Sequence, residues 1–361
     1  MIQPPKTTLP PDVTRLCADI AAAADGLEPL ALMEVCGTHT HAVRRFGVRQ
    51  LLPENVKLLS GPGCPVCVTA EKDVAAALSL AKRPGVALCC FGDMLRVPAG
   101  GESLLALKGR GADVRVCVSP MDVFSTAKRE PQTTFVWFGV GFETTAPNTA
   151  ALAEAALADG VENLFILSAH KTMPNALKTL LSEEAGVSAL LCPGHVAAVT
   201  GAEAFRFLPE ELGLPAAISG FEPEEILLAI LALVKMLRSG KASLFNAYPR
   251  VVRPEGNRAA LTLLERVFEP CAANWRGLGE ILDSGLRMKR EYAALDANIR
   301  WDLSGIECAE NPACRCGDVL RGRIEPTQCA CFGHACTPQN PLGACMVSSE
   351  GTCAAYYQYE R

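Results

Sequence analysis

The feature that most constrains this chain is the density of cysteine near its C-terminal end. Eight of its seventeen cysteines lie between residues 308 and 353, at Cys308, Cys314, Cys316, Cys329, Cys331, Cys336, Cys345 and Cys353. This segment is short of large aliphatic residues and rich in glycine, proline and polar residues, so it buries little apolar surface of its own. A metal or a set of disulfides is therefore expected to hold it together.

The composition predicts a soluble globular protein of two or three domains. The chain has 361 residues, of which 49% are hydrophobic and 20% charged, and its net charge is -5. No basic run is present to neutralise phosphates, so we expect no nucleic-acid partner. The first residues lack the pattern of a signal peptide, and the longest apolar run, 226–234, is too short to span a membrane. We therefore expect a cytoplasmic protein, in which clustered thiols favour metal or redox chemistry over structural disulfides.

Short apolar runs alternate with helical patterns along most of the chain. The expected strands are 31–35, 56–60, 86–91, 114–119, 134–140, 164–169, 189–192 and 216–219, and the clearest expected helices are 71–81, 146–158 and 224–237. This alternation predicts an α/β fold with two lobes, each a parallel β-sheet flanked by helices. We expect the first lobe over residues 1–155, the second over 156–245, and a helical segment followed by a cysteine-rich domain over 246–361.

Most of the chemically distinctive side chains directly follow expected strands. They are Cys36, His39, His41, Cys64, Cys67, Asp93, Glu143, His170, His195 and Glu222. Because ligands bind beyond the carboxyl ends of strands in open α/β sheets, we expect a cleft between the lobes to collect these groups and to face the tail. Each single polar residue also fits an ordinary loop or capping role.

Cys64 and Cys67 form a C-x-x-C sequence in a loop stiffened by glycine and proline, before a helix expected to begin near Thr69. A thiol at a helix N-terminus ionises more readily, which favours reversible disulfide chemistry or ligation of a soft metal. The alternative is half of a structural zinc site, but the chain has no second C-x-x-C to complete it.

Cys36 lies three residues before His39 and five before His41. Sulfur and imidazole together suit iron, zinc or copper, and an imidazole can also activate a thiol as a nucleophile. The alternative is a buried cysteine beside histidines that cap a helix.

In the tail, Cys316, Cys329, Cys336 and Cys353 have the spacing C-x12-C-x6-C-x16-C. Four thiolates from a long irregular segment can enclose an iron–sulfur cluster or a zinc ion, although zinc ribbons usually use two tight C-x2–4-C pairs. Cys345 is an alternative to Cys353, and the other thiols could pair as a disulfide beside the metal. The remaining cysteines lie in apolar surroundings and are predicted to pack in the core: Cys17, Cys89, Cys90, Cys117, Cys192 and Cys271.

These features together closely resemble the HypD family of [NiFe]-hydrogenase maturation factors, and the match runs from Cys36 to Tyr359. The shared sequences are CGTHT at 36–40, GPGCPVC at 61–67, FGDMLRVP at 91–98, GFETTAP at 141–147, PGHV at 193–196, GFEP at 220–223, WRGLG at 275–279 and CTPQNPLGACMVSSEGTC at 336–353.

The resemblance implies two α/β lobes and a C-terminal domain that holds a [4Fe–4S] cluster. It implies a scaffold on which the Fe(CN)2CO unit is built before delivery to the hydrogenase large subunit. In that family the cysteine matching Cys36 holds the iron together with a cysteine of a HypC-type chaperone, and cyanide arrives from a HypE-type donor. The positions matching Cys64 and Cys67 take part in the chemistry, and His39 belongs to the same motif as Cys36.

Two other classes of function also account for parts of the sequence. An iron–sulfur-dependent thiol–disulfide oxidoreductase explains Cys64, Cys67 and the tail, but gives Cys36 and His39 no task. A structural protein stapled by zinc explains the tail alone.

Overall fold

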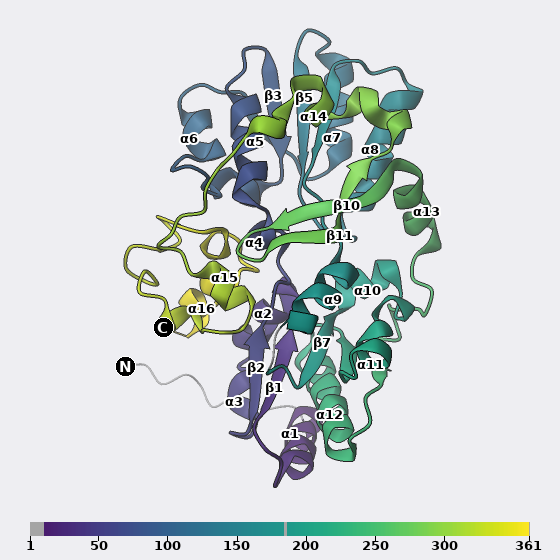
Figure 1. Cartoon of the computed structure of the whole chain (residues 1–361), viewed down its shortest axis with the longest axis vertical. Helices are drawn as coiled ribbons and strands as arrows, with labels where there is room; N and C mark the ends of the chain where they lie inside the picture. The colour runs from purple at the N-terminus through teal and green to yellow at the C-terminus, as the bar shows by residue number, and fades with distance from the viewer. Residues whose placement is uncertain (1–10, 184–185, 361) are drawn as a thin grey trace.

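The computed structural model describes residues 11–183 and 186–360. Two parallel sheets lie one above the other along the long axis of the molecule, as Figure 1 shows. A long hairpin lies between them, and the cysteine-rich tail packs beside the junction, where the tip of the hairpin reaches it. The α/β fold with two parallel sheets is therefore confirmed.

The lower sheet in Figure 1 has the strand order β2-β1-β7-β8-β9, with every neighbouring pair parallel. Its strands are β1 (Leu30–Glu34), β2 (Val56–Ser60), β7 (Ala189–Pro193), β8 (Ala216–Ser219) and β9 (Leu244–Asn246). The upper sheet has the order β4-β3-β5-β6 and is also parallel. Its strands are β3 (Val86–Cys90), β4 (Val114–Val116), β5 (Thr134–Gly139) and β6 (Leu164–Ser168).

The chain passes from the lower sheet to the upper one and then back. It leaves after β2, builds β3 to β6 above, and returns with β7 next to β1. The sheets therefore group the strands differently from the expected division at residue 155, which placed β1 and β2 with β3 to β5. Apolar runs reveal that strands exist, but the pairing of β1 with β7 depends on long-range packing that no local pattern records.

Strands and helices form where the sequence predicts them because the central strands are apolar on both faces. Every residue of β3 and β7 is buried, as expected for a parallel sheet covered by helices. The helices up to the hairpin are α1 (Pro11–Ala24), α2 (Gly37–Arg45), α3 (Val48–Leu51), α4 (Pro65–Val68), α5 (Glu71–Ala81), η1 (Gly92–Arg96), α6 (Leu104–Gly109), α7 (Pro120–Arg129), α8 (Ala146–Ala158), α9 (Met173–Glu183), α10 (Gly194–Thr200), η2 (Glu203–Phe205), α11 (Phe207–Glu211), α12 (Pro223–Ser239) and α13 (Arg258–Val267).

One apolar cluster connects the inner faces of both sheets to the tail. It contains Met33 of the lower sheet, Leu88 of the upper sheet, Trp275 of the hairpin and Cys345 of the tail. Separate clusters fill the outer face of each sheet, between β1 and α12 below and between β5 and α8 above. As predicted for core cysteines, Cys89, Cys90 and Cys192 are buried, whereas Cys17, Cys117 and Cys271 are half-buried.

The expected helical segment after residue 246 is only partly helical. α13 is followed by an antiparallel hairpin of β10 (Phe268–Trp275) and β11 (Gly279–Met288), which the sequence analysis missed. Proline, glycine and a register shift after Cys271 interrupt the alternation that normally reveals a strand. The tail then consists of short elements: η3 (Arg290–Leu295), α14 (Ala297–Trp301), η4 (Leu303–Gly305), α15 (Cys316–Leu320), η5 (Pro326–Gln328), η6 (Ala344–Met346) and α16 (Thr352–Tyr359). Across 11–183 and 186–360, no helix combines the length and apolar character needed to cross a membrane.

Candidate functional site

Two loops that leave neighbouring strands form the centre of the site. β1 and β2 are parallel and pair over their whole length, so the loops carrying Cys36 and Cys64 leave the same edge of the lower sheet. The backbone N–H of Gly37 donates to the carbonyl oxygen of Gly63, at 2.9 Å. The two thiol-bearing loops are thus joined by a backbone hydrogen bond, as the strand-end argument predicts.

Gly63 lets these loops approach more closely than any side chain would allow. A Cβ placed there would lie under 3.0 Å from the backbone nitrogen and Cα of Cys36 and from the carbonyl carbon of Val35. These neighbours are backbone atoms, so they cannot rotate away. Glycine is therefore required at position 63 for the two loops to meet.

Cys36 is a buried thiol at the N-cap of α2, with 6% of its surface exposed. Burial raises the pKa of this thiol to about 12, the backbone N–H of His39 opposes the rise, and the negative charges of Glu350 and Glu34 add to it. At neutral pH the metal-free protein therefore holds Cys36 protonated. A metal ion that binds Cys36 must displace this proton.

Glu34, which the sequence analysis did not select, holds the turn that carries Cys36. Its carboxylate is buried at the end of β1 and accepts hydrogen bonds from the hydroxyl of Thr40 and from the backbone N–H of Cys36, the latter at 3.3 Å. Burial raises the pKa of Glu34 to about 7, and the hydrogen bond from Thr40 and the charge of Arg44 limit the rise. An acidic residue that ends a run of apolar strand residues is the signal that could have identified it.

His39 ties the Cys36 loop to the loop after β8. Its ring is fully buried, Nε2 lies 2.8 Å from the carbonyl oxygen of Gly220, and the ring packs on Phe221 with centroids 4.8 Å apart. Burial lowers the pKa of His39 to about 4, so the ring is neutral at pH 7. Because a carbonyl can only accept, Nε2 carries the hydrogen, and Nδ1 has no hydrogen-bond partner within the described residues.

The tail covers the start of α2 through hydroxyl, imidazole and carboxylate groups. The Thr38 hydroxyl donates to Oε1 of Glu350 at 2.6 Å and lies 3.4 Å from Nδ1 of His195. His41 instead contacts Ser349 of the tail, with its Nδ1 3.3 Å from the Ser349 carbonyl oxygen. His195 therefore lies beside Thr38 in the first turn of α2, whereas His41 contacts the tail.

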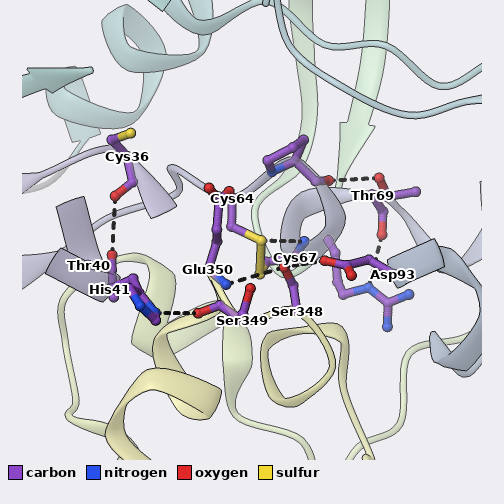
Figure 2. The surroundings of a disulfide bond; sticks show 12 residues. Cys36, Thr40, His41, Cys64, Cys67, Thr69, Asp93, Ser348, Ser349 and Glu350 are labelled. Atoms are coloured by element: carbon purple, nitrogen blue, oxygen red, sulfur yellow. Dashed lines mark hydrogen bonds between the residues drawn. A yellow bond between two sulfur atoms is a disulfide. The ribbon is translucent and has the colours of Figure 1, made fainter. Parts of the chain in front are cut away.

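Cys64 and Cys67 form a disulfide across the one-turn helix α4, and both residues are buried. The expected helix near Thr69 is α5, which begins at Glu71, so the C-x-x-C precedes it as a separate turn. The backbone N–H of Cys67 donates to Sγ of Cys64 at 3.2 Å. Figure 2 shows the disulfide beside Ser348 and Glu350 of the tail, with the Cys36 sulfur pointing away from it.

Asp93 is a second strand-end residue that reaches the tail. The hydroxyl of Ser348 donates to its Oδ2 at 2.8 Å, and Ser348 also accepts from the backbone N–H of Glu350 (Figure 2). Asp93 thus orders the segment that lies against both Cys36 and the disulfide. This segment was recognised in the sequence only as part of a longer pattern, so Glu350 was not selected by itself.

The remaining strand-end residues have structural partners away from the thiols. Glu143 accepts from the backbone N–H of Met173 at 2.9 Å, and burial raises its pKa to about 7. His170 is buried, with Nε2 3.3 Å from the Thr149 hydroxyl. Glu222 caps α12. An ordinary loop or capping role therefore describes these three residues better than a role beside Cys36.

Seven of the eight tail cysteines line one pocket: Cys314, Cys316, Cys329, Cys331, Cys336, Cys345 and Cys353. The eighth, Cys308, lies apart with Sγ 3.7 Å from Glu71 Oε2. Burial, followed by the nearby charges of Cys316, Cys314, Cys336 and Cys329, raises the pKa of Cys353. The tail thus gathers residues spread over forty positions around one point.

The donor chemistry of this pocket, which is lined by thiols, suits an iron–sulfur cluster. Among the residues that the structure describes, no three Cys, His, Asp or Glu side chains converge as ligands of one metal ion. The thiols instead surround a pocket, and the backbone N–H of Leu342 donates to Sγ of Cys336 at 3.4 Å. Hydrogen bonds to sulfur are typical of cluster ligands. The set predicted from spacing, Cys316, Cys329, Cys336 and Cys353, lies entirely in this pocket, as does the alternative Cys345.

Fold and site together define a two-sheet α/β protein in which a buried thiol and a C-x-x-C disulfide pack against a thiol-lined tail. The model of the HypD family, described as the hydrogenase formation hypA family, matches residues 12–360. The chain belongs to the HypD family.

Individual relatives agree along nearly their whole length. The chain is 44% identical over 355 residues to hydrogenase maturation factor HypD of Azotobacter vinelandii, which covers 96% of this chain and 94% of the relative. It is 43% identical over 337 residues to the protein of the same name from Escherichia coli strain K12, covering 92% and 90%. The corresponding protein of Cupriavidus necator is 42% identical over 356 residues, covering 96% and 94%. These similarities support a role in hydrogenase maturation.

Proposed function

We propose that this protein is a scaffold for assembly of the Fe(CN)2CO moiety of [NiFe]-hydrogenase, with Cys36 as its own ligand to the iron. The observation that carries the proposal is the placement of Cys36 as a buried thiol where the C-x-x-C loop and the tail meet. Iron that carries cyanide and carbon monoxide is a soft centre and favours thiolate ligands. Burial of Cys36 keeps water away from the iron it would hold.

Iron binding at Cys36 is coupled to the loss of one proton. Because the pKa of this thiol is raised to about 12, Fe²⁺ binds as the Sγ–H bond breaks and the proton passes to solvent. His39 and Glu34 hold the turn that presents the sulfur, one through Gly220 and the other through Thr40. A single thiolate leaves other positions on the iron open. A cysteine of a HypC-type chaperone would fill one, a HypE-type protein would deliver cyanide, and the finished unit would pass to the hydrogenase large subunit.

In the tail, Cys316, Cys329, Cys336 and Cys353 would hold a [4Fe–4S] cluster, with Cys345 as the alternative fourth ligand. Such a cluster, when bound, supplies single electrons. The Cys64–Cys67 disulfide accepts two electrons and two protons, and its S–S bond breaks to give two thiols. The electrons originate from a low-potential one-electron reductant. Packing of α4 against η6, which contains Cys345, gives a short path between the two groups.

The test is infrared spectroscopy on the protein purified anaerobically with its small chaperone. Cys36→Ala is expected to abolish the Fe–CN and Fe–CO bands while the visible absorption of the cluster is unchanged. Cys192→Ala, which removes a thiol buried in β7, is the matched control and is expected to keep both signals. Retention of the bands in Cys36→Ala would remove this residue from the role.

The second candidate function is an iron–sulfur-dependent thiol–disulfide oxidoreductase, which the disulfide beside a thiol-rich tail favours. Reduction of insulin with a low-potential donor separates the two functions, because a scaffold shows little turnover. Metal analysis of the same anaerobic sample addresses the zinc-stapled alternative. Colourless protein with stoichiometric zinc would support that alternative against both others.

A further inference from the structure

Arg276 is a buried cation between the C-x-x-C helix and the thiol-lined pocket, and it has no part in the proposed function. It lies at the turn of the β10–β11 hairpin, whose tip reaches α4 and α15 in Figure 1. Only 1% of its surface is exposed. Arginine is rarely buried to this extent without a specific task, because removing its charge from water is costly.

One side of Arg276 holds the end of the C-x-x-C helix. Its backbone N–H donates to the carbonyl oxygen of Val68, and its Nε donates to the carbonyl oxygen of Thr69, both at 2.9 Å. Its Nη1 makes an ion pair with Oε1 of Glu71 at 2.9 Å, where α5 begins. These bonds satisfy backbone oxygens just after Cys67, so Arg276 fixes the position of α4.

The other side of the same turn packs against the first turn of α15, where Cys316 lies. A Cβ on Gly317 would be 2.7 Å from the carbonyl oxygen of Gly277, and Gly277 has a φ of +71°. The two backbones therefore touch directly, and neither position has room for a side chain. The turn thus contacts Val68, the residue after Cys67, on one side and Gly317, the residue after Cys316, on the other.

The charge of Arg276 acts on the thiols of the pocket. The guanidinium of Arg276 lies within electrostatic range of Cys314, Cys316 and Cys345. Nη2 of Arg276 is buried and has no hydrogen-bond partner within the described chain. The guanidinium thus retains donor capacity and positive charge beside the thiols.

We propose that Arg276 is the positioning residue that couples the tail cluster to the Cys64–Cys67 pair, by fixing α4 against α15 and by raising the reduction potential of the cluster. The inference rests on the cluster of the proposed function. Reduction adds an electron to an already anionic group, and a permanent buried cation favours the reduced form because water and salt screen it weakly. This positioning role gives a function to Arg276 of the WRGLG sequence at 275–279.

The test is a redox titration of the anaerobic, cluster-loaded full-length protein, followed through the paramagnetic signal of the reduced cluster. Arg276→Gln is expected to shift the reduction equilibrium at least tenfold toward the oxidised cluster, about 59 mV for one electron. Arg276→Lys keeps the charge and is expected to remain near the wild-type potential. Arg287→Gln is the matched control, because Arg287 is an exposed residue of the same hairpin that pairs with Glu269 at 2.7 Å. It is expected to leave the potential unchanged.

A purely structural role is separated by removing both members of the buried ion pair. Glu71→Gln with Arg276→Gln leaves no unpaired buried charge, so thermal stability is expected to recover relative to Arg276→Gln alone. Its potential is expected to lie between those of Arg276→Gln and the wild type, because loss of the Glu71 carboxylate offsets part of the lost positive charge. A wild-type potential in cluster-loaded Arg276→Gln would overturn the inference and leave the proposed function intact. A wild-type protein that holds no iron–sulfur cluster would overturn both. Loss of the infrared bands in Cys36→Ala tests the proposed function alone.

Discussion

The ring of His39 should resist protonation well below the pH at which ordinary histidines titrate. It is fully buried, its Nε2 donates to the carbonyl oxygen of Gly220, and burial lowers its pKa from 6.5 to about 4. In the unfolded chain the ring has its ordinary pKa. Between these two values the unfolded state therefore binds more protons than the folded state.

This difference fixes the sign and size of the effect on stability. A lowered folded pKa gives stability that is complete above pH 6.5 and is lost as the pH falls through 4. A difference of about 2.5 units at 1.36 kcal/mol per unit amounts to roughly 3 kcal/mol. In His39→Gln the amide nitrogen replaces Nε2, so the bond to Gly220 can form without a titrating ring. The pH dependence of the variant is expected to be flatter than that of the wild type by this amount.

Two measurements check the reasoning. Nitrogen-15 NMR of the imidazole rings resolves the five histidines of the chain, and His39 is expected to remain the neutral Nε2–H form from pH 8 down to about pH 5. Urea unfolding at pH 7 and at pH 4 then gives the difference between wild type and His39→Gln, in which the contributions of other titrating groups cancel. A His39 ring that titrates near pH 6.5, or that carries its hydrogen on Nδ1, would refute the argument.

Three further predictions follow from other contacts of the site. Gly63→Ala is expected to destabilise the protein by about 3 kcal/mol or more, because its Cβ meets backbone atoms of Cys36, and chemical denaturation measures the loss. Alkylation of Cys36 in the metal-free protein, followed by peptide mass spectrometry, should keep accelerating above pH 9, where an ordinary thiol such as glutathione levels off; a plateau near pH 9 would contradict the raised pKa. Cys353→Ser is expected to abolish the visible absorption of the cluster and Cys345→Ser to keep it, and the opposite result would exchange the two ligands.

Much of the fold is readable from local sequence because parallel strands covered on both faces must be apolar throughout. The eight expected strands are present, and the helices expected at 71–81 and 146–158 are α5 and α8. The hairpin of β10 and β11 was missed, since its half-exposed strands contain Pro270 and an irregular register. When the neighbours of a strand's buried face change along its length, the two-residue alternation of apolar and polar side chains is too weak to be recognised.

The residues of the site likewise differ in whether the local sequence or the folded structure identifies them. Cys36, Cys64 and Cys67 are recognisable because thiols beside glycine, proline and histidine at strand ends are chemically unusual wherever they fold. Glu34 looks ordinary in the sequence, because only its burial shows that it holds the turn after β1. Arg276 also looks ordinary, and its importance depends on burial beside partners far away in the chain.

The sequence by itself determined the α/β class, the strand-end thiols and the cysteine-rich tail, because these depend on residue type and short-range spacing. Only the tertiary structure decided that β1 pairs with β7, that His39 binds Gly220 and that the hairpin turn lies between the disulfide helix and the tail. The physical reason is that pairing, burial and the shifts of pKa arise from neighbours that packing brings together across long separations in the chain.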